Sequence, residues 1–439
     1  MNKIKKINAN VVVALMILIM SGCSTNKKEP TSPLIEYKVQ SRIDKNPEPS
    51  SFLPSKAHYA EGSFSENVVV VTQRVLNKDS FMLKKALVKP VADDGFSAWQ
   101  LLCDEGGMTY EQSSPNPLSY LTTGIASSLL TQVQHSVETM NLHIDDIKVE
   151  TKVFFRFDEL MSDKWAGYTD KAIVNILIQS KESPEKISQL KQIALKSWTV
   201  GEGLANKTNI ETELVVNGDH WKTKSSKRGS VPDSTSVDNN MTITSKTSIP
   251  MPTTFEVGED VGITPMTLFS NKIEFAVVAI AQSARDTKRP YLQKIKVRAI
   301  QDNYAAWTLY ADDSYGYEGL DKAPTSLDYV TAGTALCLMS QLDINQEFFR
   351  LINRRFKKFD IEDYRVEQQI NYRQEEIDSL KTTGFVDKVI TKIVVNSKAS
   401  KEDLKTFFNT SLQMCFAGEA FKNETEIDSN LYLNGKIIK

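Results

Sequence analysis

Two long segments of this chain each occur twice. The run YLTTGIASSLLTQV from Tyr120 is matched by YVTAGTALCLMSQL from Tyr329. The run VGEGLANKTNIETELVVNG from Val200 is matched by AGEAFKNETEIDSNLYLNG from Ala417. The repeats keep their order along the chain, so we expect two related domains in tandem. A chain of 439 residues is also too long for one ordinary core, since single cores rarely grow beyond about 250 to 300 residues.

The overall composition excludes several classes of function. A formal net charge of −2 provides no basic field for nucleic acid. The four histidines are scattered without the spacing of metal ligands, and no glycine-rich phosphate loop follows an expected strand. We therefore expect no nucleic-acid partner, no metal and no nucleotide cofactor.

The N-terminus has the pattern of a targeting signal. Three lysines precede an apolar stretch from Val11 to Met20, which is too short to span a bilayer. The following Ser-Gly-Cys resembles a bacterial lipobox, which implies that residues 1–23 are a lipoprotein signal peptide and that Cys23 is lipidated. A plain secretory signal is the alternative. By the same resemblance, Ser24 favours the periplasmic face of the outer membrane, so we expect a lipid-anchored protein of the cell envelope.

Composition also divides the mature chain. Residues 24–64 are rich in Pro, Ser and Lys and predict a flexible tether, and residues 221–268 form a second, Ser/Thr-rich linker. The two expected domains are then residues 65–220 and 269–439. Only the second contains the pair Cys337 and Cys415.

Each copy shows strand and helix patterns, which predicts an α+β fold. Runs rich in β-formers cover residues 66–104 and 272–312. Signals for helix starts follow at Asn116, Ser183, Thr325 and Ser400. The first helix of each copy has small residues on one face, including Gly124 and Gly333, so another backbone can approach it and we expect it to be buried.

The two cysteines of interest lie in the second copy. Cys337 falls within the first helix, and Cys415 continues the apolar stripe of the second, at helical spacing from Phe407 and Ser411. In the first copy the matching residues are Ser128 and Trp198. Thiol chemistry, if present, is therefore confined to the second half.

These features together resemble the OsmC/Ohr superfamily of thiol peroxidases. In the family pattern NPEQLFAAGYAAC the cysteine stands twelve places after the Asn, the interval from Thr325 to Cys337 and from Asn116 to Ser128. The resemblance implies two tandem OsmC-like domains, each a β-sheet packed around two buried helices. The first domain would pack on the second as an intramolecular pseudo-dimer.

The resemblance also implies a chemistry. Cys337 would reduce an organic hydroperoxide and become a sulfenic acid, Cys415 would resolve it to a disulfide, and an unknown thiol reductant would reset the pair. In the family, an arginine held by the glutamate of N-P-E activates the cysteine. Here that position is Leu118 or Leu327, so only a carboxylate elsewhere, Asp328 or Glu318, would replace it. The candidate activating arginines are Arg74, Arg285, Arg289 and Arg298.

Two alternatives remain open at the level of sequence. Cys337 and Cys415 can form a static structural disulfide, or remain buried thiols, instead of a redox-cycling pair. Equally, both copies can lack chemistry, so that the lipoprotein binds an apolar ligand or a protein of the envelope.

Overall fold

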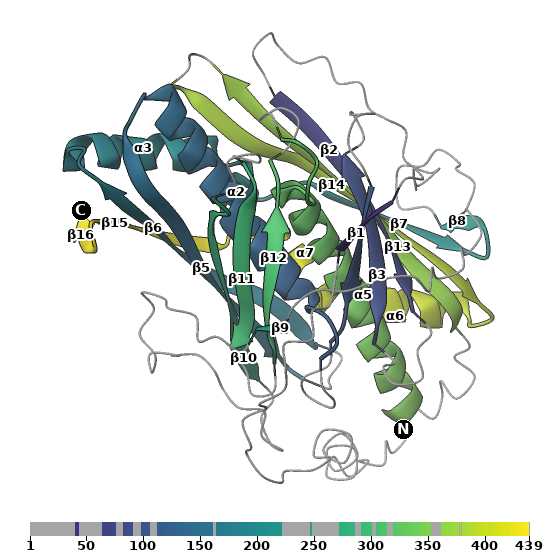
Figure 1. Ribbon diagram of the computed structural model, residues 1–439. Coiled ribbons are helices and arrows are strands. Elements are labelled where there is room, and N and C mark those ends of the chain that lie inside the picture. The colour runs from purple at the N-terminus through teal and green to yellow at the C-terminus, as the bar shows by residue number, and fades with distance from the viewer. Residues whose placement is uncertain are drawn as a thin grey trace.

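A computed structural model gives the fold. It describes residues 40–43, 64–75, 82–90, 98–105, 112–160, 164–221, 246–247, 272–285, 291–300, 304–313, 319–352, 361–376, 378 and 380–438. The described residues form an α+β structure with two eight-stranded sheets and helices between them (Figure 1). The expected lipidation site, Cys23, lies outside these residues.

The first sheet draws strands from both halves of the chain. Its order is β1 (Gln40–Ile43), β4 (Ala98–Cys103), β3 (Lys84–Pro90), β2 (Phe64–Arg74), β13 (Ile361–Glu376), β14 (Thr382–Ser397), β7 (Ile210–Val216) and β8 (Asp219–Trp221). The exchange between halves occurs where β2 pairs antiparallel with β13 and where β14 pairs parallel with β7.

The second sheet repeats this arrangement with the halves reversed. Its order is β16 (Lys436–Ile438), β15 (Glu426–Leu433), β6 (Ala166–Ser180), β5 (Ile144–Asp158), β10 (Ile273–Ser283), β11 (Gln293–Ile300), β12 (Ala306–Ala311) and β9 (Lys246–Thr247). Here β10 pairs with β5, and β15 pairs with β6. The two halves are thus interleaved as a pseudo-dimer, because each sheet needs strands from both.

Six helices are described. They are α2 (Pro117–Thr139), α3 (Pro184–Ser197), α4 (Thr199–Ala205), α5 (Ser326–Ile352), α6 (Lys401–Gln413) and α7 (Phe416–Lys422). At three of the expected starts the N-cap side chain accepts a hydrogen bond from a backbone N–H of the first turn; these N-caps are Asn116, Ser183 and Ser400. The fourth has a reciprocal box in which Asp328 N donates to Thr325 Oγ1 and Thr325 N donates to Asp328 Oδ2.

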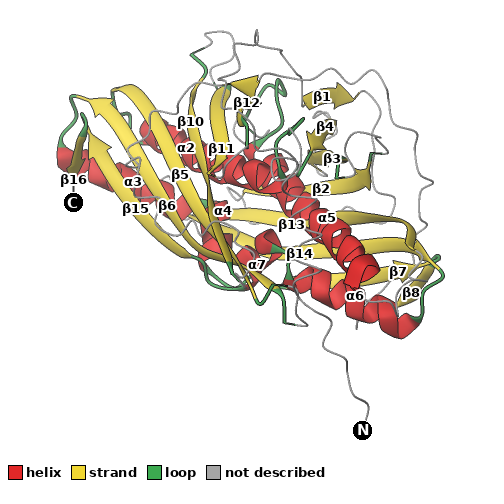
Figure 2. Cartoon of the chain, turned by 90° about the horizontal axis from the view of Figure 1, so that it is seen from below, coloured by secondary structure: helices red, strands yellow, loops and turns green. Residues whose placement is uncertain are grey.

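The long helices α2 and α5 cross between the two sheets (Figure 2). A Cβ built on Gly333 would lie 2.5 Å from Leu121 N, and one built on Gly124 would lie 2.7 Å from Ser326 O. Only glycine allows this approach. The rings of Tyr120 and Tyr329 stack beside the crossing with their centroids 5.9 Å apart.

Each half also holds the loop that precedes the other half's long helix. Trp99 Nε1 donates to Asp321 Oδ1 at 3.3 Å, and Trp307 Nε1 donates to Gln112 Oε1 at 3.3 Å. Both tryptophans are buried. Their hydrogen bonds add a reciprocal tie between the halves.

Candidate functional site

The structure brings Cys337 and Cys415 together. Their Sγ atoms lie 3.6 Å apart, and the two residues are only 1% and 3% exposed. A disulfide needs about 2.05 Å, so the sulfur atoms have to approach by roughly 1.5 Å. Both thiols are free, and the pair is placed to form a bond with little rearrangement.

Cys415 does not sit inside a helix, which differs from the expectation drawn from its apolar spacing. The helix α6 ends at Gln413, and Cys415 takes an extended conformation (ψ 101°) as the N-cap residue of α7. Its Sγ accepts a hydrogen bond from Gly418 N at 3.3 Å. The apolar residues of α6 and Cys415 keep helical spacing across the break between α6 and α7. The periodicity of the sequence therefore did not reveal where α6 ends.

The surroundings of Cys337 disfavour the thiolate. Burial, followed by the hydrogen bond and the charge of Cys415, raises the pKa of the Cys337 thiol well above its usual value. The carboxyl of Glu105 raises it further, and a backbone hydrogen bond at Ala417 acts in the opposite direction. The thiol of Cys337 is therefore protonated at neutral pH unless a base accepts its proton.

An ion-pair network adjoins this region on α5. Asp343, six residues after Cys337, is 1% exposed and pairs with Arg74 Nε at 3.0 Å and with Lys84 Nζ at 3.3 Å. It also accepts a hydrogen bond from the hydroxyl of Tyr364. The Arg74 guanidinium lies 5.0 Å from the centroid of the Tyr364 ring. Both cations come from strands of the first half, so the network joins the two halves.

Sequence reasoning missed Lys84 and Glu105. Lys84 is fully buried, and Lys84 and Cys103 are cross-strand partners on β3 and β4. Burial lowers the pKa of Lys84, but Asp343, Cys103 and Glu105 more than offset this, so the pKa is raised. Lys84 is the first residue of β3, and Glu105 follows the end of β4 by two residues. Charged residues at such places ordinarily face solvent, so the sequence carried no signal that selected them.

Of the candidate arginines, Arg74 is the one that the structure brings to α5. Arg285 is exposed and pairs with Asp146 at 2.8 Å, and Arg298 is exposed on β11. Arg289 lies outside the described residues, as does Glu318. Asp328 serves the cap of α5, and its burial raises the pKa of this carboxyl to about 7.

The first half has no thiol at the matching place. Trp198 Nε1 donates to Ser128 Oγ at 2.8 Å, and both residues are buried. The tryptophan ring occupies the position of Cys415. Cys103 is the last residue of β4 and is fully buried.

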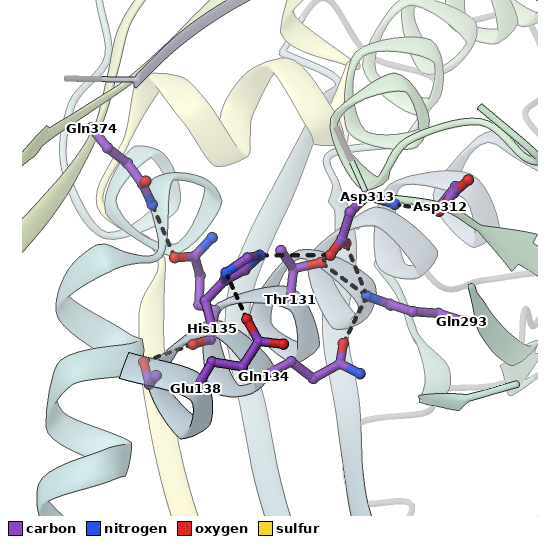
Figure 3. Close-up of polar contacts among 10 residues, drawn as sticks. Thr131, Gln134, His135, Glu138, Gln293, Asp312, Asp313 and Gln374 are labelled. Carbon is purple, nitrogen blue, oxygen red and sulfur yellow. Dashed lines mark hydrogen bonds and ion pairs between the residues drawn. The ribbon is translucent and has the colours of Figure 1, made fainter. Parts of the chain in front are cut away.

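A polar cluster follows Ser128 on α2 and includes Thr131, His135, Gln293 and Asp313 (Figure 3). Asp313 Oδ1 accepts from Thr131 Oγ1 at 2.5 Å, and Gln293 Nε2 donates to Thr131 Oγ1 at 2.9 Å. His135 Nε2 lies 3.7 Å from Asp313 Oδ2. Gln293 pairs with Ala311 at the end of β12, as Lys84 pairs with Cys103 at the end of β4, so Gln293 takes the place that Lys84 has on the cysteine side.

Aromatic side chains pack around the residue after Cys415. The Phe416 ring contacts those of Phe155, Phe157 and Phe275, with centroids 5.7, 4.2 and 5.3 Å apart. Thr169 Oγ1 donates to Phe416 O at 2.9 Å. This cluster fixes the start of α7 against the second sheet.

The described residues show neither a metal site nor a membrane-spanning helix. No group of three or more His, Cys, Asp or Glu side chains is placed to hold a metal ion. Similarly, none of the described helices combines the length and apolar character that a membrane crossing requires.

Comparison with known proteins supports the resemblance drawn from the motifs. Residues 110–213 match the family model described as OsmC-like protein. The chain therefore contains an OsmC-like domain, and its resemblance to the OsmC/Ohr superfamily is confirmed.

Individual proteins add little to the family match. One solved structure, an OsmC-like hydroperoxide resistance protein from Jannaschia sp. CCS1, is 16% identical, and the alignment covers 37% of this chain and 96% of that chain with a TM-score of 0.23. No curated protein matches the chain significantly.

Proposed function

We propose that the protein is a thiol-dependent peroxidase that reduces organic hydroperoxides through Cys337 and Cys415. The observation that carries the proposal is the 3.6 Å separation of the two Sγ atoms, at positions that keep the spacing of the family. The OsmC-like segment supports a role in hydroperoxide resistance. Because the first half has Ser128 and Trp198 in place of the two cysteines, it is catalytically inactive. It supplies strands and charged groups to the second half.

The proposed cycle has three steps. The sulfur of Cys337 attacks the terminal peroxide oxygen, the O–O bond breaks, and the alcohol leaves with the thiol proton. The resulting sulfenic acid is attacked by the Cys415 thiol, so that an S–S bond forms and water leaves. An external thiol reductant then returns both residues to thiols by exchange.

A second candidate is a lipoprotein without catalysis that binds an apolar ligand or an envelope protein. It is favoured by the raised pKa of Cys337 and by the acidic neighbour Glu105. The same geometry would then serve as a static disulfide or as two buried thiols.

Peroxide consumption by the full chain with a small dithiol as reductant distinguishes the two candidates. The first predicts that Cys337→Ser abolishes consumption and that Cys103→Ala retains it. Equal consumption by the wild type and Cys337→Ser would leave the second candidate.

We further propose that the chain is attached to the cell envelope by lipid at Cys23, on the periplasmic face of the outer membrane, as its N-terminal pattern predicts. Membrane fractionation tests this proposal. Replacing Cys23 with Ala should move the protein from the outer-membrane fraction to the soluble fraction, whereas unchanged membrane recovery would contradict it.

A further inference from the structure

The junction between α6 and α7, where Cys415 lies, is held by the first half on both sides of the cysteine. Before the cysteine, a Cβ built on Gly167 would lie 2.4 Å from Met414 O, so the backbone of β6 packs directly on this carbonyl. After the cysteine, Thr169 Oγ1 donates to Phe416 O at 2.9 Å, and Thr169 is buried. The strand β6 therefore fixes the backbone that carries the Cys415 side chain.

The end of the β5 and β6 hairpin is itself firmly held. Phe157 on β5 is the cross-strand partner of Gly167, and its ring centroid lies 4.2 Å from that of Phe416. The neighbouring Arg156 donates to both carboxylate oxygens of Asp170 on β6, from Nε and Nη2 at 2.9 Å each. A bidentate pair of this kind fixes geometry as well as charge. The hairpin end is therefore a well-defined support for the junction.

The other half repeats the close approach but not the hydrogen bond. Gly384 on β14 has the matching place in the repeat, and a Cβ built on it would lie 2.7 Å from Ser197 O at the junction of α3 and α4. That junction carries Trp198. Two residues further along, β14 has Val386 where β6 has Thr169. The close approach is thus common to both halves, whereas the hydroxyl that holds the junction is found only beside the cysteine.

From these contacts we propose that Gly167 and Thr169 position Cys415 for its attack on the sulfenic acid of Cys337. The inference rests on the proposed peroxidase function, and it gives the first half a part in the second step of the cycle. The two sulfur atoms start 3.6 Å apart, and a disulfide needs about 2.05 Å within a narrow range of dihedral angles. The placement of the Cys415 backbone therefore decides how readily the sulfurs meet.

The step that the two residues assist balances in atoms and electrons. The Cys415 thiol attacks the sulfenic sulfur of Cys337, so that an S–S bond forms and the S–O bond breaks. The hydroxide that leaves takes up the thiol proton and becomes water. The Cys337 sulfur is reduced from the sulfenic to the disulfide level, and the Cys415 sulfur is oxidised to the same level. Gly167 and Thr169 take no part in these bond changes and act through the backbone on either side of Cys415.

The test measures the two steps separately in the full chain. Reduced protein is mixed with tert-butyl hydroperoxide at concentrations at which disulfide formation is the slower step. At successive times, dimedone traps the sulfenic acid and an alkylating reagent traps the remaining thiols. Mass spectrometry then quantifies the thiol, sulfenic and disulfide forms. The loss of thiol gives the rate of the first step, and the appearance of the disulfide gives the rate of the second.

The added methyl group of Gly167→Ala has to displace Met414 O, which is backbone. A misplacement of about 1 Å can slow a reaction about 100-fold, so we expect disulfide formation to slow by about this factor. The first step should be unchanged, so the sulfenic acid accumulates. The matched control is Gly384→Ala, which overpacks the junction beside Trp198 and should leave both rates unchanged. A merely structural role would affect the two variants alike.

Thr169→Val tests the hydrogen bond without overpacking, because it gives β6 the residue that β14 has. The loss of this hydrogen bond should slow disulfide formation about fivefold, and Thr169→Ser should restore the rate. Disulfide formation at the wild-type rate in both Gly167→Ala and Thr169→Val would overturn the positioning role, as would equal slowing by Gly384→Ala. A wild-type protein that loses thiols no faster than Cys337→Ser would overturn the peroxidase function itself, and the positioning role with it.

Discussion

Trp198 donates its indole N–H to Ser128 Oγ at 2.8 Å, at the two positions that match Cys415 and Cys337. In the second half the corresponding atoms are two sulfurs 3.6 Å apart. The same pair of positions therefore makes a fixed hydrogen bond in one half and a potential covalent bond in the other. Each contact joins a long buried helix to the junction of two shorter helices that pack against it. These are α2 with α3 and α4 in the first half, and α5 with α6 and α7 in the second.

The first prediction concerns the ionisation of Cys337. Because burial and Cys415 raise its pKa, the thiolate forms only at a pH above the usual range for cysteine. A titration of thiolate ultraviolet absorbance, taken as wild type minus Cys337→Ser, should show this step on the alkaline side. A step below the ordinary cysteine pKa would contradict the conclusion that the surroundings of Cys337 disfavour its thiolate.

The second prediction concerns Asp343 and Lys84. Asp343→Asn leaves the ammonium of Lys84 buried without its carboxylate, so we expect the free energy of unfolding to fall by about 3 to 5 kcal/mol. Adding Lys84→Met should recover much of this loss, since the unpaired charge is gone. Chemical denaturation of the two single variants and the double variant measures the coupling. Additive losses would show that the pair does not interact.

The third prediction concerns the buried cap residue Asp328. Its pKa is raised from 3.8 to about 7, mainly by burial, so the folded state holds its proton more tightly than the unfolded state. The stabilisation from this group is present below the unfolded pKa and is lost as pH rises through the folded pKa. Asp328→Asn keeps an acceptor for Thr325 N and removes the charge.

At about pH 8 this variant should therefore have a free energy of unfolding higher than wild type by on the order of a few kcal/mol. It should melt at a correspondingly higher temperature. Near pH 4 the advantage should largely disappear. Melting curves at both pH values measure it. A difference that does not change with pH would indicate that Asp328 titrates normally.

The fourth prediction concerns the helix crossing. Gly333→Ala places a Cβ 2.5 Å from Leu121 N, which is backbone and cannot yield easily. Overpacking of this kind costs typically about 1 to 3 kcal/mol. Gln413→Ala, an exposed change in α6, should stay within about 0.5 kcal/mol of wild type. Equal stability of the two variants would mean that the helices separate at little cost.

Much of the fold could be predicted from the sequence, because its signals are local. Caps at Asn116 and Ser400, the small face around Gly124 and Gly333, and the register of Cys337 are all set within a few residues. The interleaving of strands was not predictable in this way, since the pairing of β2 with β13 joins residues nearly 300 positions apart, as from Gln73 to Arg365.

The site shows the same division. The cysteine pair followed from the repeat, whereas Lys84 and Glu105 could not be selected from sequence, since their partners lie on the other half's helix. Cys415 as an N-cap was also missed, because α6 ends only two residues earlier and the apolar spacing continues across the break.

The most direct test of the account is to reduce the full chain, add one equivalent of an organic hydroperoxide, and map its cysteines by alkylation and mass. We predict that a disulfide between Cys337 and Cys415 forms much faster than in a peroxide-free sample, and that Cys415→Ser stops at a Cys337 sulfenic acid. Thiols that persist at the peroxide-free rate would contradict the peroxidase and would leave a binding or structural lipoprotein.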